Sequence, residues 1–85
     1  MSDFEVKITH EAEKDIQKLS PVLKDKFFDI LSEVIAKNPF QGKKLIGDLR
    51  ESYSYKLSFK DRIVYKIDVK HRIIYIQRAR THYGD

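Results

Sequence analysis

Cysteine and tryptophan are absent from this chain of 85 residues, and glycine and proline are scarce, with three and two residues. The lack of cysteine excludes disulfides, thiolate metal sites and a cysteine nucleophile. The three histidines, His10, His71 and His82, lack the spacing of metal ligands, so we expect neither a metal nor another cofactor. No apolar run could span a membrane and no signal-peptide pattern is present, so we expect a cytoplasmic protein without membrane contact.

Length and charge limit the organisation of the chain and its partners. Eighty-five residues form one small domain, residues 1–85, with a single core. The net charge of +4 is unevenly spread, because residues 1–42 hold six Lys and Arg against eight Asp and Glu, whereas residues 43–85 hold eleven against five. Positive charge on one half favours a polyanion or an acidic protein as a partner, without distinguishing between the two.

The first half of the chain has the pattern of a strand and two helices. Apolar and charged residues alternate over residues 4–8, which is the period of a half-buried strand. Thr9 can cap a first helix, and Ser20 with Pro21 ends that helix and begins a second one. The second helix stops before Asn38, because a residue preceding proline avoids helical geometry. Each helix has one apolar stripe, so we expect a helical hairpin packed on one face of a sheet.

The second half has the pattern of a loop and three strands. Residues 39–51 contain two of the three glycines and predict a loop. Residues 53–59, 62–67 and 72–77 predict strands joined by short turns, which form an antiparallel meander. The predicted fold class is therefore α+β, with an N-terminal strand, a two-helix hairpin and a three-stranded antiparallel meander. The apolar odd positions of residues 53–59 should lie under the helices, and so should the strand tyrosines: Tyr53, Tyr55, Tyr65 and Tyr75.

The other face of the sheet is predicted to be basic. Ser54 and Lys56 should lie on it, and in the neighbouring strands so should Arg62, Val64, Lys66, Arg78 and Arg80. Such a surface suits a polyanion; the alternative is that these charges only solubilise an ordinary exposed face. Residues 78–85 then add His82 and Tyr83 directly after a buried strand. Arginine stabilises phosphate charge, histidine moves a proton near neutral pH and tyrosine stacks on a base, so the set suits phosphodiester chemistry on RNA. A solvated basic tail is the alternative here.

Several segments of this chain resemble the RelE/ParE superfamily of bacterial type II toxins. Residues 62–67 (RIVYKI), preceded by 55–57 (YKL), resemble the central strands of that superfamily. Residues 39–42 (PFQG) and 44–49 (KLIGDL) look like the loop before them, and residues 80–83 (RTHY) are similar to the end of the YoeB branch. The similarity spans essentially the whole chain, including the order of strand, helices and meander.

The resemblance implies a toxin that cuts messenger RNA in the ribosomal A site, where it would also contact 16S rRNA. In that family a 2′-hydroxyl attacks the adjacent phosphate and leaves a 2′,3′-cyclic phosphate and a 5′-hydroxyl. The reaction needs a base, cations for the phosphate and an acid for the leaving oxygen, and no metal. The resemblance also implies an acidic antitoxin that folds on the basic surface and gives a toxin–antitoxin hetero-oligomer.

The resemblance assigns roles to individual residues. Arg62 matches the arginine that stabilises the transition-state phosphate, and Lys56 matches a basic residue that touches phosphate. Arg80 lies near a second phosphate-binding arginine. His82 matches the proton-transfer histidine, and Tyr83 the tyrosine that orients the substrate. Further RNA contacts are predicted for the remaining cations near these positions: Lys43, Lys44, Lys66 and Arg78.

One departure from the family concerns the general base. YoeB-like members carry a glutamate where this chain has Lys43, so the base should be Asp48, Glu51 or His82 with a lysine assisting. Residues 84–85 also extend past the usual His-Tyr end. Two other functions remain open: a ParE-like inhibitor of DNA gyrase, which needs no His-Tyr pair, and a catalytically degenerate binding module, which the lysine at position 43 favours.

Overall fold

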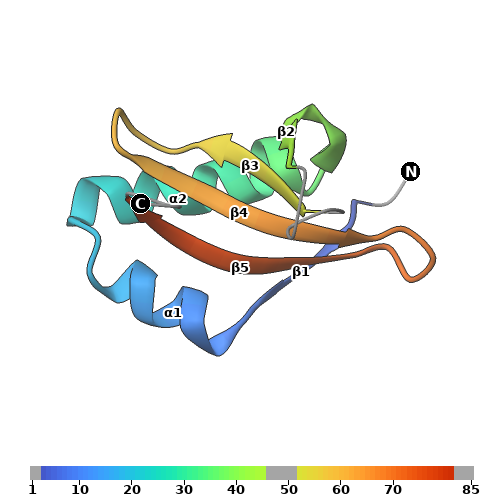
Figure 1. The fold of residues 1–85 in the computed structure, drawn as a ribbon, viewed down its shortest axis with the longest axis horizontal. Coiled ribbons are helices and arrows are strands. Elements are labelled where there is room, and N and C mark those ends of the chain that lie inside the picture. Colours follow the sequence, from blue (N-terminus) through green and yellow to red (C-terminus); the bar gives the residue numbers. More distant parts are fainter. Residues whose placement is uncertain (1–2, 46–51, 82–85) are drawn as a thin grey trace.

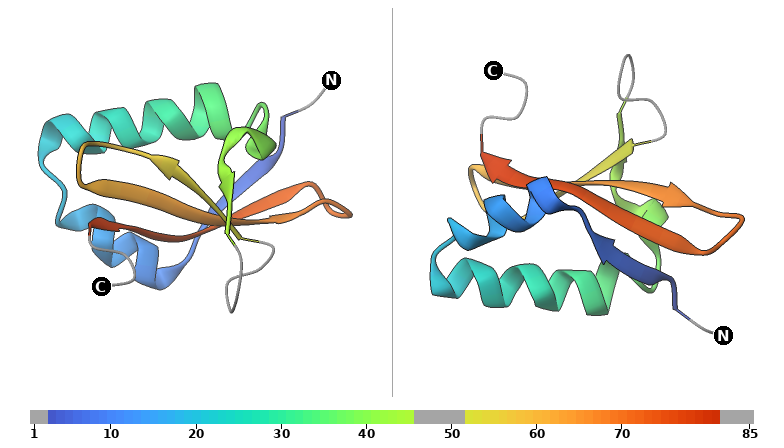
Figure 2. Two further views of the ribbon diagram at one scale, coloured as in Figure 1. Left: turned by 45° about the horizontal axis from the view of Figure 1, so that its top comes forward. Right: turned by 90° about the horizontal axis from the view of Figure 1, so that it is seen from below.

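A computed structural model describes residues 3–45 and 52–81, except for the side chains of Arg80 and Thr81. Within these residues the strands form a five-stranded sheet in the order β1-β5-β4-β3-β2 (Figure 1). β1 (Glu5–Ile8) runs parallel to β5 (Ile73–Thr81), whereas β4 (Asp61–Asp68), β3 (Ser52–Lys56) and β2 (Lys43–Lys44) continue the sheet with antiparallel pairs. Both α-helices lie on the same face of this sheet (Figure 2). The predicted α+β class and the placement of its helices are confirmed.

The two helices begin at the residues that the sequence indicates. α1 (His10–Gln17) starts at Thr9, whose hydroxyl accepts from the Ala12 amide at 3.2 Å and donates to the Ile76 carbonyl at 2.7 Å. This cap therefore also ties α1 to β5. α2 (Pro21–Ile30) starts at Ser20 and continues as a π-helical segment, η1 (Leu31–Ile35). Together the two cover the length predicted for the second helix, with a wider final turn.

The hydrophobic core fills the space between the sheet and the helices. α2 contributes Phe27, which is fully buried, and the central strands contribute Ile63 and Tyr65. The Tyr65 hydroxyl donates to the Pro39 carbonyl at 2.6 Å, so this buried polar group is satisfied. Other members of the core are Phe4, Ala12, Ile16, Ile30, Leu31, Ile35, Leu57, Ile74, Ile76 and Ala79.

A β-bulge in β5 changes which side chains face the core. Val64 pairs with Arg78 while Tyr65 pairs with Ile76, so Gln77 is left without a partner in β4. Ile76 faces the core before the bulge and Ala79 after it. The predicted core position of Tyr75 is wrong, because this residue pairs with Lys66 on the opposite, open face. A plain alternation through residues 72–77 could not reveal the extra residue.

The second half of the chain differs from the sequence prediction in three main respects. The segment predicted as a loop contains a 3-10 turn, η2 (Pro39–Gln41), and β2, which pairs with β3. β3 ends at Lys56 instead of residue 59, because the Leu57 and Ser58 amides both donate to the Asp61 carbonyl and close a turn. β5 continues to Thr81 instead of ending at residue 77, so the arginines after the bulge belong to a strand.

Candidate nucleic-acid interface

Three basic residues occupy one cross-strand row at an end of the sheet. Lys56 pairs with Arg62, and Arg62 pairs with Arg80 on its other side. The Lys56 and Arg62 side chains are exposed on the open face, away from the helices. Arg80 is placed by its strand register alone. Because direct cross-strand neighbours have Cβ atoms about 5 Å apart, these three positions concentrate positive charge within about 10 Å.

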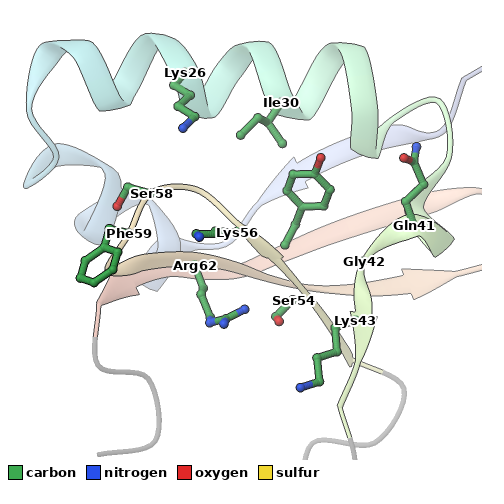
Figure 3. A pocket seen from close by; sticks show the side chains of 11 residues that line it. Lys26, Ile30, Gln41, Gly42, Lys43, Ser54, Lys56, Ser58, Phe59 and Arg62 are labelled. Carbon is green, nitrogen blue, oxygen red and sulfur yellow. The ribbon is translucent and has the colours of Figure 1, made fainter.

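The row lies beside an open groove of about 770 Å³ (Figure 3). The groove is bounded by α2 on one side and by β2, β3 and the β3–β4 turn on the other. Among the described residues that line it there are four cations and no carboxylate; the cations are Lys26, Lys43, Lys56 and Arg62. Four different elements thus contribute positive charge to one cavity, which favours an anionic ligand.

The turn before Arg62 is held by side-chain hydrogen bonds. The Ser58 hydroxyl donates to an Asp61 carboxylate oxygen at 2.9 Å and accepts from the Asp61 amide at 3.0 Å. Leu57, at the start of the turn, is fully buried. Arg62 therefore directly follows a turn of fixed conformation. Phe59 lies at the tip of this turn and has 93% of its surface exposed. The sequence alternation had placed Phe59 under the helices, and that prediction is wrong.

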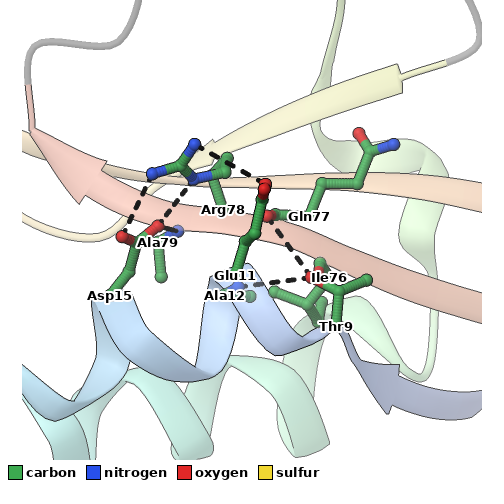
Figure 4. Close-up of polar contacts among 8 residues, drawn as sticks. All are labelled: Thr9, Glu11, Ala12, Asp15, Ile76, Gln77, Arg78 and Ala79. Carbon is green, nitrogen blue, oxygen red and sulfur yellow. Dashed lines mark hydrogen bonds and ion pairs between the residues drawn. The ribbon is translucent and has the colours of Figure 1, made fainter.

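Arg78 contacts a buried carboxylate instead of the groove (Figure 4). Its Nε and Nη2 donate to the two carboxylate oxygens of Asp15 at 2.9 and 3.2 Å, and Glu11 lies 3.8 Å away. Asp15 also accepts from the Ala79 amide at 3.1 Å, beyond the point where β1 stops pairing with β5. The guanidinium charge is thus compensated, and the pair fastens α1 to the edge of β5.

The other predicted site residues are spread over the molecule. Lys44 is exposed opposite Tyr53, outside the lining of the groove. Lys66 lies toward the other end of β4, where it lines a separate hollow of about 380 Å³ with Tyr75. Four predicted residues lie outside the described residues, namely Asp48, Glu51, His82 and Tyr83. The structure therefore brings together Lys43, Lys56 and Arg62, with Arg80 in register.

The predicted site residues did not include Lys26 and Phe59, which line the groove. Lys26 lies one helical turn before Ile30 on α2, and both line the groove. In the sequence, only the spacing of Lys26 from Ile30 indicates that both lie on one face of the helix, and no pattern indicates which strand this helix covers. Phe59 has the periodicity of a core residue, so its exposure depends on where the turn begins.

The described residues also bear on the predictions for His71 and for a metal site. His71 lies in a turn, where its hydrogen bonds to Asp68 lower the pKa of that carboxyl group. Within residues 3–45 and 52–81, no cluster of three or more His, Cys, Asp or Glu side chains has the arrangement of a metal site. The same part of the chain has no helix that is both long and apolar enough to cross a membrane.

A protein-family comparison identifies the chain. The model of a family described as the ParE-like toxin of type II bacterial toxin–antitoxin systems matches residues 6–83. The chain belongs to this toxin family. Its assignment to the RelE/ParE superfamily, made from sequence segments, is confirmed. No curated protein matches the toxin.

Solved structures share the fold of this toxin over nearly its whole length. The RelBE2 toxin–antitoxin complex from Mycobacterium tuberculosis contains a chain that is 25% identical, with a TM-score of 0.85, and the match covers 94% of this chain and 99% of that one. A YoeB/ParE toxin from Agrobacterium tumefaciens is 20% identical, with a TM-score of 0.82 and coverage of 93% and 99%. The intact RelBE complex from E. coli matches at 19% identity, with a TM-score of 0.77 and coverage of 94% and 98%. The toxin therefore has the RelE/YoeB/ParE fold.

Proposed function

We propose that this toxin is a ribosome-dependent endoribonuclease that cuts mRNA in the ribosomal A site and so inhibits translation. The observation that carries the proposal is the groove, where Lys56 and Arg62 stand side by side among cations from two further elements. A cavity with this charge suits a phosphodiester backbone. RNA provides its own nucleophile in the 2′-hydroxyl, so the protein must supply only position, charge and proton transfer.

The proposed reaction assigns one step to each kind of group. A base removes the proton of the 2′-hydroxyl, whose oxygen bonds to the adjacent phosphorus. The bond from phosphorus to the 5′-oxygen then breaks, and an acid protonates that oxygen, leaving a 2′,3′-cyclic phosphate and a 5′-hydroxyl. Arg62 and Lys56, with Arg80, stabilise the charge that develops on the phosphate oxygens.

Proton transfer and substrate orientation are assigned to residues outside the described part of the chain. We assign the acid to His82, because histidine side chains in general can move a proton near neutral pH, and the orientation of the substrate to Tyr83. The base is drawn from Glu51, Asp48 or His82, because the groove position matched by the family glutamate holds Lys43. Lys43 instead adds a cation beside the phosphate, and Lys44 and Lys66 are proposed to contact the RNA elsewhere. The predicted RNA contact of Arg78 is not carried into the proposal, because Asp15 holds its guanidinium.

An acidic antitoxin is the proposed protein partner. The solved relatives from M. tuberculosis and E. coli are described as toxin–antitoxin complexes. The same excess of cations that would attract RNA would attract an acidic segment of such a partner, and that segment would fold as it binds. Binding there would block the groove, so inhibition and the formation of a hetero-oligomer would be one event.

Inhibition of DNA gyrase is the second candidate, because the matching family is described as ParE-like. A gyrase inhibitor acts by binding and does not require Arg62 to stabilise a transition state. The two functions differ in what stops first when the toxin is induced. A nuclease arrests translation and creates new RNA ends, whereas a gyrase inhibitor arrests replication with mRNA intact.

The deciding experiment is a primer-extension map of mRNA in bacteria that express the toxin. We expect new 5′ ends within translated frames for the wild type and none for Arg62→Ala or His82→Ala. Lys70→Ala is the matched control, since Lys70 is exposed in the β4–β5 turn, far along β4 from Arg62. It should cut at the wild-type rate.

Each other result would overturn the nuclease proposal or the role of the groove in it. Growth arrest with intact mRNA would favour gyrase, and purified toxin should then inhibit supercoiling. A folded protein that causes neither arrest nor cuts would be a binding module that has lost activity. Cuts that persist at full rate in Arg62→Ala would remove the groove from the mechanism.

A further inference from the structure

Phe59 is an exposed aromatic side chain at the rim of a basic groove. It lines that groove together with Lys26, Lys56 and Arg62, and 93% of its surface is accessible to solvent. A fully exposed phenylalanine contributes little to the core, so packing does not explain its presence. Aromatic side chains beside cationic grooves are the usual platforms on which the bases of single-stranded nucleic acids stack.

The turn that carries Phe59 is held in one conformation. The Ser58 hydroxyl accepts from the two amides that follow Phe59, from the Lys60 amide at 3.3 Å and from the Asp61 amide at 3.0 Å. The Leu57 amide donates to the Asp61 carbonyl at 2.9 Å, and the Leu57 side chain is buried in the core. The backbone that carries the ring is therefore ordered before binding, which lowers this part of the entropic cost of stacking.

The groove passes from the open face of the sheet to the helix side. β2 pairs with β3 only at Tyr53 and Ser54, so within the described residues the edge of β3 has no strand partner at Tyr55 and Lys56. The groove lies along this free stretch of edge, and Lys26 points into it from α2 on the far side (Figure 3). An extended strand of RNA bound at Arg62 therefore has a charged path round the edge.

We propose that the RNA follows this path, with one base stacked on Phe59 and a phosphate flanking that base bound by Lys26. The inference rests on the proposed nuclease function and extends its substrate site beyond the scissile phosphate. Arg62 and Lys56 hold the phosphate that reacts. Phe59 and Lys26 are positioning residues that fix the neighbouring nucleotide and touch no reacting atom.

The test pairs changes in the protein with changes in the RNA. Cleavage is followed in single turnover on ribosomes programmed with mRNAs that carry one abasic nucleotide at successive positions around the cut. At one position, the abasic nucleotide should slow the wild type about 5- to 150-fold, which is the range expected for one stacked base. Phe59→Ala should be slowed by a similar factor on intact mRNA, and the same abasic nucleotide should slow it no further.

Lys26 is tested with mRNAs in which one phosphate is replaced by a neutral methylphosphonate. At one linkage beside the stacked base, the wild type should require more toxin for half-maximal cleavage, and Lys26→Gln should show no additional loss there. Lys24→Gln is the matched control, because Lys24 is on the same helix and does not line the groove. It should respond to the methylphosphonate as the wild type does.

The outcomes separate this inference from the proposed function. If the wild type cuts programmed mRNA and each abasic nucleotide slows Phe59→Ala as much as it slows the wild type, the inference is overturned and the nuclease proposal stands. A Phe59→Ala variant that cuts intact mRNA at the wild-type rate has the same meaning. If the wild type cuts nothing, the nuclease proposal fails, and so does the inference that rests on it. Circular dichroism of each variant checks folding, which substitution of these exposed or partly exposed residues should not disturb.

Discussion

Lys56 and Arg62 are direct partners across β3 and β4, although both are cations. Like charges in opposite positions of antiparallel strands destabilise a sheet. The described residues that line the groove include no carboxylate to offset the repulsion. The pair is therefore unfavourable for the fold and favourable for binding a polyanion, which is the pattern of a functional site placed on a stable scaffold.

Replacing Lys56 should separate these two effects. Lys56→Gln removes the repulsion with Arg62, so we expect the free energy of unfolding to rise by about 0.2–1 kcal/mol. The same change should slow cleavage on programmed ribosomes. Urea denaturation and single-turnover kinetics measure the two quantities, and Lys70→Gln should change neither. A loss of stability in Lys56→Gln would contradict the repulsion argument.

Removal of the Asp15 carboxylate should be among the most destabilising changes in the protein. Asp15 is buried and accepts from both Arg78 and the Ala79 amide. Asp15→Ala removes the nearest carboxylate from a partly buried guanidinium and leaves a buried amide without its acceptor, at a cost of about 3–5 kcal/mol. Urea denaturation measures it. Glu11→Ala is the control, because this exposed residue is 3.8 Å from Arg78 and should cost under about 1 kcal/mol. Equal effects of the two substitutions would refute the assignment.

Gly42 should tolerate no larger side chain while Tyr65 keeps its hydroxyl. A Cβ atom at position 42 would collide with the Tyr65 hydroxyl and lie 2.9 Å from the Ser54 carbonyl oxygen. We expect Gly42→Ala to lower the free energy of unfolding by about 1–3 kcal/mol through overpacking. In the Tyr65→Phe background the loss should be smaller, and a double-mutant cycle measures the difference. Additive effects would show that the collision is relieved elsewhere.

Alkaline pH should weaken the fold through Tyr65. Burial raises the pKa of this tyrosine from 10.0 to about 12, since the phenolate is poorly solvated in the core. The folded state holds the proton more tightly than the unfolded state does, so this stabilisation is complete below pH 10. It is lost as the pH rises from 10 to 12. The tyrosinate absorbance should show one late step, absent in Tyr65→Phe, whose free energy of unfolding should also fall less over that interval.

Local patterns determined most of the architecture because they depend on neighbouring residues. Thr9 and Ser20 have the chemistry of helix caps, and both caps form. The alternation after Arg62 correctly placed Val64 and Lys66 on the face opposite the helices, where they pair with Ser54 and Ser52. β2 could not be found this way, since two consecutive lysines carry no alternation and their pairing depends on a distant strand.

The candidate site was only partly accessible from the sequence because its assembly is non-local. The pairing of Lys56 with Arg62 could be inferred from the alternation, whereas the register of Arg80 depends on the β5 bulge, which the alternation does not reveal. The pairing of Arg78 with Asp15 joins residues 63 positions apart, and no short-range pattern indicates it. The position of Lys26 beside the groove likewise depends on which strand edge α2 covers, which no short-range pattern indicates.

The parallel pairing of β1 with β5 also has a consequence for the order of synthesis. Val6 pairs with Ile74, and α1 is fastened to the part of β5 that follows. Ribosomes make β1 and both helices first, so these elements must wait for residues 73–81 before the sheet can close. Contacts between such distant segments form late in folding. A translation product interrupted before this segment therefore lacks a closed core. It also lacks Arg80, the third cation of the row that Lys56 and Arg62 begin, so it should be harmless to the cell that made it.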